Sequence, residues 1–276
     1  MSIKKFIPEV WAEAIERENA VKSVFIEDCN REYEGKIEKK GDTVHILGVG
    51  KPTIKDIPKS GILEDPEDIP DSTVTLVVDQ QKYFNYQVDN IDRAMAVGNV
   101  MAALNEETSE GISATMDSFV AGLARDEAVK PIYTTPRIIT AENIFDVIDE
   151  AALALYENNV HNSTKITLTI PPRAFMIFRK RYIELDTNNS QLIKGYSIAQ
   201  YGNITIKQSN NCFRDADGVD HVMIRTKRAL AFVQSVKDVI AYQPEKSFKD
   251  AVKGYFLYGA KVVRPKEVFS IPMKYN

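Results

Sequence analysis

The chain has 276 residues, 44% of them hydrophobic, and a formal net charge of −4 from 35 basic and 39 acidic residues. This composition supports one large folded domain or two modest ones, and it excludes both global disorder and a nucleic-acid binder that relies on a strong positive excess. No apolar run approaches the ~20 residues of a membrane span, and Met1–Trp11 lacks the apolar region of a signal peptide. The solitary Cys29 and Cys212 fit synthesis in a reducing compartment.

The first predicted elements are a short amphipathic helix within residues 1–30 and then an arm that lacks a core of its own. The arm alternates apolar and polar residues only briefly, and many Gly and Pro residues interrupt it. A two-stranded ribbon with one apolar face is marginal in water unless it packs on something. The arm is therefore predicted to lie on a neighbouring copy of the protein, with residues 38–72 exposed and mobile in a free subunit. Its expected pieces are a strand at Tyr33–Ile37, a turn at Lys39–Asp42, a strand at Thr43–Leu47, a loop over 51–72 and a strand over 73–78.

A long helical pattern follows, from about Ile91 to Arg125. Polar residues and Gly111 interrupt the pattern and predict a bend or break near 105–111. We expect its apolar stripe to pack on the C-terminal strands, including Tyr255–Tyr258. The stripe consists of Met101, Leu104, Ile112, Met116 and Phe119.

The second half of the chain alternates predicted helices with short strands. Thr140 is the expected N-cap of a helix that ends near Glu157, and Pro171-Pro172 begins another that carries Phe175 and Phe178. The remaining predictions are strands at Lys165–Ile170, Ile204–Gln208, His221–Thr226, Ala229–Ser235, Tyr255–Tyr258 and Lys261–Val263, and a turn at Asp215–Asp220.

No set of residues has the spacing of a catalytic, cofactor-binding or metal site. His45, His161 and His221 lack the spacing of metal-ligand motifs. Asp215–Asp220 resembles the start of a calcium loop but lacks its distal Glu, so we expect an ordinary turn. Gly48–Pro52 lacks the frame of a phosphate loop and is expected to be a flexible kink. We therefore predict that the chain is not an enzyme; the alternative is an enzyme with an unrecognised site.

Two charge clusters stand out. The acidic residues Glu64, Asp65, Glu67 and Asp68 are expected in a solvated loop or against basic residues of a neighbouring subunit. Arg179-Lys180-Arg181 forms a basic cluster, for which a salt-bridged helix face is favoured over a contact to DNA.

The order of these pieces resembles the major capsid proteins of tailed bacteriophages, which have the Hong Kong 97 capsid fold. Near the start, Asn30–Ile37 and Lys40–Val44 are similar to the family's first strand and the entry to its extended loop. Near the end, Ala241–Glu245, Phe248–Gly254 and Tyr258–Pro265 are similar to its closing strands. The resemblance covers the full length, and the long helix after the arm supports it.

The resemblance implies an α+β fold and a set of domains. These are an N-terminal arm (1–30), an extended loop (31–88), a spine helix with the peripheral domain (89–159), an axial domain (160–235) and C-terminal strands of the peripheral domain (236–276). No cleaved scaffolding segment is visible. Some members crosslink a Lys of the extended loop to an Asn, but Lys51, Lys55 and Lys59 have no matched acceptor here.

The function that the resemblance implies is self-assembly, as pentamers and hexamers, into an icosahedral shell. The shell would enclose double-stranded DNA without sequence specificity, as a virion capsid assembled in the host bacterial cytoplasm. Expected partners are separate scaffolding and portal proteins, with a cement protein left open; no membrane, cofactor or metal is expected. The alternative is the shell of an encapsulin-type bacterial nanocompartment, which shares the fold but encloses cargo enzymes.

Overall fold

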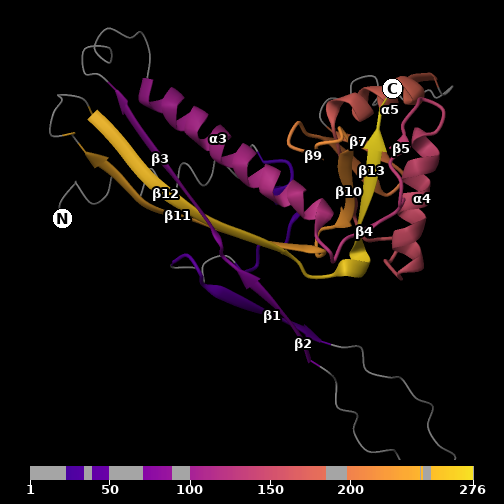
Figure 1. Ribbon diagram of the computed structural model, residues 1–276, viewed down its shortest axis with the longest axis horizontal. Helices are drawn as coiled ribbons and strands as arrows, with labels where there is room; N and C mark the ends of the chain where they lie inside the picture. The colour runs from indigo at the N-terminus through magenta and orange to yellow at the C-terminus, as the bar shows by residue number, and fades with distance from the viewer. Residues whose placement is uncertain are drawn as a thin grey trace, which may run out of the picture.

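A computed structural model describes residues 23–33, 39–49, 71–88, 100–184, 198–242, 244 and 250–275. It shows an elongated body and a compact body side by side (Figure 1). The predicted helix within residues 1–30, the strand at Tyr33–Ile37 and most of the loop over 51–72 lie outside the described residues.

The elongated body is a long sheet with a helix along one face. Its strands β11 (Leu230–Tyr242), β12 (Asp250–Val262) and β3 (Gln80–Val88) pair antiparallel in the order β11-β12-β3. Helix α3 (Val100–Gly122) runs along this sheet (Figure 1) and continues into the 3₁₀ helix η2 (Leu123–Arg125). The C-terminal strand-like runs predicted separately are one strand, β12, and β3 was not predicted as a strand of this sheet.

Helix α3 passes through residues 105–111 without a break. Of the predicted bend or break, the break is therefore wrong and the bend stays a prediction. Gly111 lies on the exposed side of the helix, where its cost of about 1 kcal/mol relative to Ala is local. Ile112 and Met116 on the other side are buried in the core of the elongated body. This packing offsets the low helix propensity of the polar stretch.

The predicted packing of α3 on the C-terminal strands is confirmed for Ile112, Met116 and Phe119. The rings of Phe119 and Tyr258 meet edge to face with their centroids 5.2 Å apart. Phe256 joins the same core, whereas Leu257 lies in a different cluster on the opposite face of the sheet. The prediction for Tyr255–Tyr258 is therefore right for alternate residues only, because side chains of a strand point to alternate faces.

The ribbon of the arm covers part of that opposite face. Strands β1 (Thr43–Val49) and β2 (Asp71–Val77) pair antiparallel. The expectation that the ribbon packs on a neighbouring copy is wrong for its base, since the apolar face meets β11 and β12 of its own chain. This cluster contains Val44, Ile46, Leu76, Val78, Ala231, Val233 and Leu257.

The predicted turn at Lys39–Asp42 leads directly into the ribbon. The Lys39 amide donates to the Asp42 carboxylate at 2.9 Å, and Gly41 has a positive φ of 92°. The Gly41 amide also donates to the Val78 carbonyl at 2.8 Å, which ties the turn to the end of β2. Gly48, predicted to begin a flexible kink, is instead part of β1 and pairs with Ser72.

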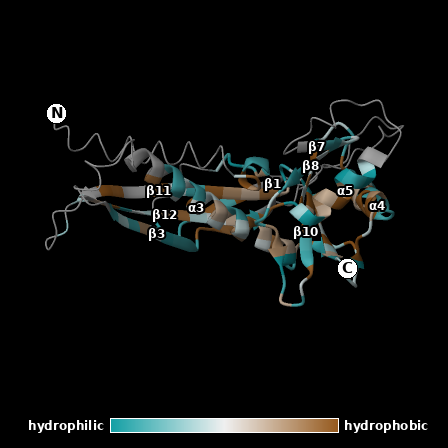
Figure 2. Cartoon of the chain, turned by 90° about the horizontal axis from the view of Figure 1, so that it is seen from above, coloured by the Kyte–Doolittle hydropathy of each residue, from teal (hydrophilic) through white to brown (hydrophobic). Residues whose placement is uncertain are grey.

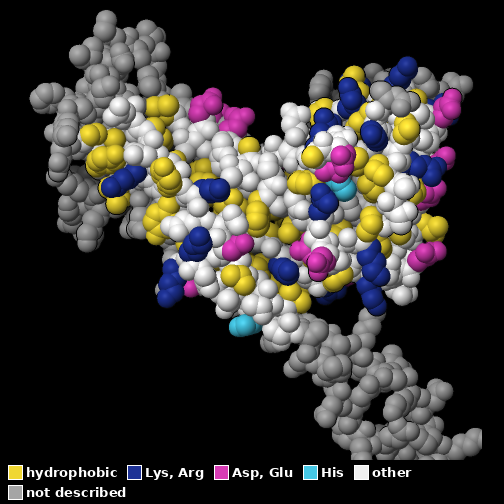
Figure 3. Space-filling view, in the orientation of Figure 1, with side chains coloured by type: hydrophobic (Ala, Val, Ile, Leu, Met, Phe, Trp, Pro, Cys, Tyr) yellow, Lys and Arg dark blue, Asp and Glu magenta, His cyan; other side chains and the backbone are white. Residues whose placement is uncertain are grey.

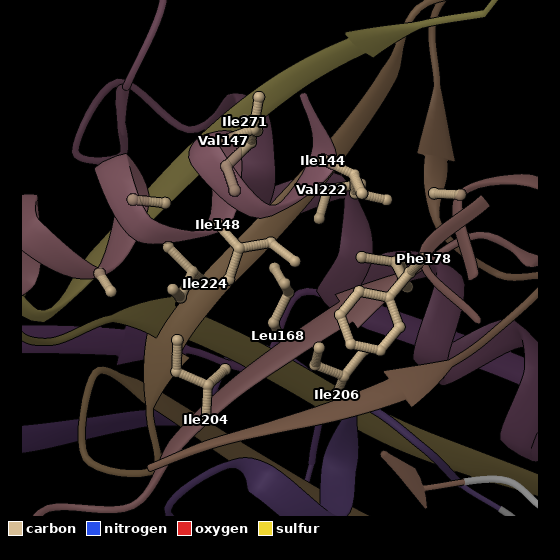
Figure 4. Close-up of a cluster of buried hydrophobic side chains, with 14 of the residues drawn as sticks. Ile144, Val147, Ile148, Leu168, Phe178, Ile204, Ile206, Val222, Ile224 and Ile271 are labelled. Atoms are coloured by element: carbon tan, nitrogen blue, oxygen red, sulfur yellow. The ribbon is translucent and has the colours of Figure 1, made fainter. Parts of the chain in front are cut away.

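The compact body is an eight-stranded sheet covered on one face by two helices (Figure 1). Helices α4 (Ile144–Glu157) and α5 (Pro172–Glu184) share one core with the central strands (Figure 4). Brown, hydrophobic stretches mark the strands inside this body, with hydrophilic residues toward its outside (Figure 2). The path of the sheet is β4 (Lys130–Pro131), β13 (Val268–Lys274), β10 (Asp220–Thr226), β6 (Ile166–Ile170), β8 (Ile204–Gln208) and β7 (Ile198–Tyr201), with β5 (Arg137–Ile138) beside β13 and β9 (Phe213–Arg214) beside β10.

The predicted strands that became β6, β8 and β10 and the helix start at Pro172 are confirmed. The predicted N-cap at Thr140 is wrong, because α4 begins at Ile144 with Asn143 as its N-cap. The Asn143 side chain accepts from the Thr140 amide at 2.9 Å and holds residues 140–143 in a turn instead. Strand β13 was not predicted, although it lies inside this sheet and brings residues 268–274 into the compact body.

Candidate assembly surfaces

The three histidines lie apart in the structure. His45 of β1 bonds with Thr75, His161 bonds with Ser163 after α4, and His221 of β10 lies 3.1 Å from an oxygen of Asp215. Within the described residues, no three His, Cys, Asp or Glu side chains form a group that could hold a metal ion. None of the described helices is long and apolar enough to cross a membrane.

The predicted turn at Asp215–Asp220 is confirmed as the link between β9 and β10. The Asp215 carboxylate accepts from the Val219 amide at 2.9 Å and from the Asp217 amide at 3.0 Å. The Val219 amide and then His221 lower the pKa of Asp215. At the turn's end, Arg214 donates twice to Asp220, at 2.6 and 2.8 Å. These carboxylates are used to shape the hairpin.

A short N-terminal segment, Ser23–Asn30, joins the two bodies. Its start is bound by Asp117, a carboxylate of α3 that is 1% exposed. Asp117 accepts from the Ser23 hydroxyl at 2.5 Å and from the amides of Val24 and Phe25 at 2.9 and 3.1 Å. Hydrogen bonds to a buried charged acceptor are among the stronger ones in proteins, so this end of the segment is held firmly to α3.

The end of the segment is bound to the long sheet. The Asn30 amide donates to the Leu230 carbonyl at 2.8 Å, and the Phe232 amide donates to the Asn30 carbonyl at 2.9 Å. Asn30 thereby pairs with the edge of β11 next to Ala231.

Two buried cations of the compact body bind the middle of the segment. Arg225 of β10, 0% exposed, donates to the Phe25 carbonyl at 3.3 Å and lies 5.1 Å from the centre of the Phe25 ring. Lys207 of β8 lies 2.7 Å from carboxylate oxygens of both Glu27 and Asp28. Burial opposes the charge of Lys207, but the two carboxylates outweigh it and raise its pKa. The segment therefore links α3, β8 and β10.

Beyond the ribbon, no segment among the described residues covers the face of the long sheet on which the ribbon lies. Tyr83 of β3 is 82% exposed, and Ile240 of β11 is 44% exposed. Tyr83 pairs with Tyr255 across the strands, and Ile240 pairs with Lys253. Exposed aromatic residues beside apolar ones are typical of the centres of protein interfaces. We call this face, around Tyr83, Ile240, Tyr242, Lys253 and Tyr255, the open sheet face.

The polar side chains of the open sheet face hold one another in place. The Tyr242 hydroxyl donates to Asn85 at 3.1 Å, and the Lys253 ammonium lies 4.8 Å from the centre of the Tyr242 ring. The opposite face of the sheet is covered by α3, against which Phe84 and Tyr86 pack. The open sheet face is therefore an ordered surface that no described segment covers.

The predicted acidic run and the basic cluster have different outcomes. Glu64, Asp65, Glu67, Asp68 and the three lysines of the loop lie outside the described residues. Arg179, Lys180 and Arg181 lie on α5, with Arg179 and Lys180 exposed. Sequence reasoning missed Asp117, Lys207 and Arg225, because their partners lie about 90 to 200 positions away and no local spacing marks them.

The fold is similar to solved structures from phages and to that of a virus-like particle. A structure of Mycobacterium phage Che8 matches with a TM-score of 0.70 and 28% identity over 92% of this chain and 91% of that chain. The capsid structure of the cyanophage P-SCSP1u matches with a TM-score of 0.69 and 14% identity over 92% and 89%. A virus-like particle from Pyrococcus furiosus matches with a TM-score of 0.57 and 13% identity over 95% and 98%.

The chain matches no protein-family model and no curated protein. The structural similarities instead extend over nine-tenths of the chain, through both bodies. The resemblance predicted from the sequence is thereby confirmed: the chain has the mixed α+β fold of the capsid proteins of tailed bacteriophages.

Proposed function

We propose that this chain is a major capsid protein that assembles, as pentamers and hexamers, into an icosahedral shell around the double-stranded DNA of a tailed bacteriophage. The observation that carries the proposal is the similarity to the Che8 structure over 92% of the chain at 28% identity. The match to the P-SCSP1u capsid structure supports it. The net charge of −4 suits a shell lining that does not bind packaged DNA tightly.

The two bodies correspond to the domains that the resemblance implies. We assign the compact body to the axial domain, the elongated body to the peripheral domain, and the ribbon β1–β2 to the base of the extended loop. With this grouping, α4 and β13 belong with the axial domain, because both share its core. On this assignment the axial domain takes in residues on both sides of the predicted range 160–235.

A shell protein needs several surfaces for its neighbours, and the open sheet face is one. Weak contacts repeated by symmetry add up to a stable shell even when each is small. The link through Ser23–Asn30 holds the two bodies of each subunit in a defined relation, which lets one subunit shape repeat around the shell. The proposal also includes separate scaffolding and portal proteins as partners, and assembly in the bacterial cytoplasm.

The test is assembly of the purified full-length chain. Sedimentation velocity and negative-stain electron microscopy should show rings, tubes or closed shells as the protein concentration rises. A chain that stays monomeric at high concentration, with and without added scaffolding protein, contradicts the proposal. Tyr83→Ser is the matched surface variant: it should leave circular dichroism and thermal unfolding unchanged and weaken assembly.

The alternative is the shell of a bacterial nanocompartment. It is favoured by the match to the virus-like particle from P. furiosus, which spans 98% of that chain, although the TM-score is lower. The contents of particles isolated from cells that carry the gene would separate the two functions. After nuclease treatment, protected double-stranded DNA supports the phage capsid, and a stoichiometric enzyme cargo without DNA supports the nanocompartment.

A further inference from the structure

The outward side of α4 is entirely acidic around one apolar residue. Positions 146, 149, 150, 153 and 157 follow the spacing of one helix face and are all exposed. Every charged residue of the helix is acidic and lies on this face. Leu153, in the middle, is 55% exposed. The acidic face consists of Asp146, Asp149, Glu150, Leu153 and Glu157.

The outward side of α5 is basic, and it too has one exposed apolar residue among its charges. Arg173, Met176, Arg179 and Lys180 are exposed, and Met176 is 60% exposed. The helix has Phe175 and Phe178 on its buried side, in the core that it shares with α4. In Figure 3, acidic side chains line the edge of the compact body along which α4 lies, and basic side chains gather near α5. We call the four exposed residues Arg173, Met176, Arg179 and Lys180 the basic face.

Within the described residues, few contacts engage the charges of the two faces. Asp149 and Glu150 accept from the hydroxyls of Tyr201 and Tyr133, and the Arg173 guanidinium lies over the Tyr275 ring. Among the described residues, no ion pair involves Asp146, Glu157, Arg179 or Lys180. Like charges that gather on one helix face repel one another, so the segregation of sign costs the free subunit stability.

We propose that the acidic face of α4 in one copy packs on the basic face of α5 in the next copy. The carboxylates then face the guanidinium and ammonium groups, and Leu153 and Met176 supply apolar contact at the centre. A second copy is the fitting occupant because one chain carries both halves of the complementary pair. Two different patches of one chain make a head-to-tail contact, which closes into a ring when the rotation allows. The inference rests on the proposed function and identifies a surface for its rings.

The test reverses the charge of each face separately and then together. In the α4 variant, Asp146→Lys, Asp149→Lys and Glu157→Lys leave three lysines against Glu150, so the face has a net positive charge. In the α5 variant, Arg179→Glu and Lys180→Glu leave two glutamates against Arg173, so the face has a net negative charge. Each variant should stay folded by circular dichroism and require more than about tenfold higher concentration for assembly, because like charges then meet. The chain with all five substitutions should assemble at close to the wild-type concentration. Glu127→Lys with Lys266→Glu, two exposed positions outside both helices, is the control and should leave assembly unchanged.

Mixing the α4 variant with the α5 variant gives a second readout. Each variant repels itself, but its faces complement those of the other variant, so an equimolar mixture should form rings in which the two alternate. Alternation requires an even number of subunits, so native mass spectrometry should find hexamers and no pentamers. A merely structural role of these charges would not produce this pattern.

The outcomes separate this inference from the proposed function. A wild-type chain that never assembles overturns the capsid proposal and the inference with it. A wild-type chain that assembles while the α4 variant and the α5 variant assemble equally well overturns the inference alone. Loss of assembly in the α5 variant only, with the α4 variant and the mixture behaving as wild type, assigns α5 to another anionic partner such as DNA and also overturns it.

Discussion

Gly259 of β12 lies against the backbone of Val77 at the end of β2. A Cβ atom on Gly259 would come within 2.6 Å of the Val77 carbonyl oxygen and 3.2 Å of the Val78 Cα. Since these atoms belong to the backbone, no side chain can rotate out of the way. The missing side chain of Gly259 therefore lets the ribbon lie close enough for Leu76 and Val78 to reach the sheet.

Gly259→Ala should lower the free energy of unfolding by about 1–3 kcal/mol, because the ribbon must shift to admit one methyl group. Urea denaturation followed by circular dichroism measures this. Gly111→Ala is the matched control. A Cβ at Gly111 meets nothing within 4 Å in the middle of α3, so this change should stabilise the chain by up to about 1 kcal/mol. The same sign of effect at both glycines would contradict the close contact at Gly259.

Met116→Ala should cost about 2–5 kcal/mol of stability, because Met116 is 0% exposed and the change leaves a cavity between α3 and the long sheet. Phe119→Ala should cost less, since Phe119 is only partly buried, although it loses the edge-to-face contact with Tyr258. Ser118→Ala, on the exposed side of the same turn, should change stability by less than about 0.5 kcal/mol. Thermal and urea unfolding of the three variants test this order, and a larger loss at Phe119 than at Met116 would count against it.

Asp117→Asn should loosen the Ser23–Asn30 link, since it removes the charge that accepts from Ser23, Val24 and Phe25. Cys29 reports on whether the segment opens. Burial raises the pKa of its thiol to about 12, so the thiol does not react while the segment is closed. In a Cys212→Ser background, labelling of Cys29 should become about tenfold faster, which corresponds to about 1.4 kcal/mol.

The control for this labelling is Glu107→Gln, an exposed position on the same helix, which should leave the rate as it is in the parent. Equal labelling rates in the Asp117→Asn variant and its parent would show that the Asp117 charge does not hold the segment closed.

Glu267 of the 3₁₀ helix η3 (Pro265–Glu267) should make stability depend on pH. Burial opposes its ionisation, but the Thr226 hydroxyl and the guanidinium groups of Arg264 and Arg228 outweigh burial and lower its pKa. A carboxylate with a lowered folded-state pKa adds stability that is present above the unfolded pKa of about 4.3 and is lost as pH falls through the folded value. Below about pH 5, the melting temperature of the wild type should therefore fall more steeply than that of Glu267→Gln. Parallel pH profiles would be inconsistent with this pairing.

Much of the secondary structure could be predicted because it is local. Helix α4 follows from the spacing of Ile144, Val147, Ile148, Ala151 and Leu155, and α5 begins where Pro172 favours a first turn. The strands that became β6, β8 and β10 are short apolar runs between turns. The order of these elements after an arm rich in Gly and Pro carried the resemblance to phage capsid proteins that the solved structures confirm.

The partners of these elements were decided by the tertiary structure. Strand β3 lies beside β12, more than 160 positions away in the chain, and β13 lies inside the sheet of the compact body. Gly259 determines where the ribbon packs on the sheet. Asp117, Lys207 and Arg225 bind the segment Ser23–Asn30, which lies far from them in the sequence. Local spacing predicts which side of a helix or strand is buried, but contacts between distant segments depend on how all the faces pack together. For the same reason the sequence shows the charges of α4 and α5, and only the fold places both faces outward on one body.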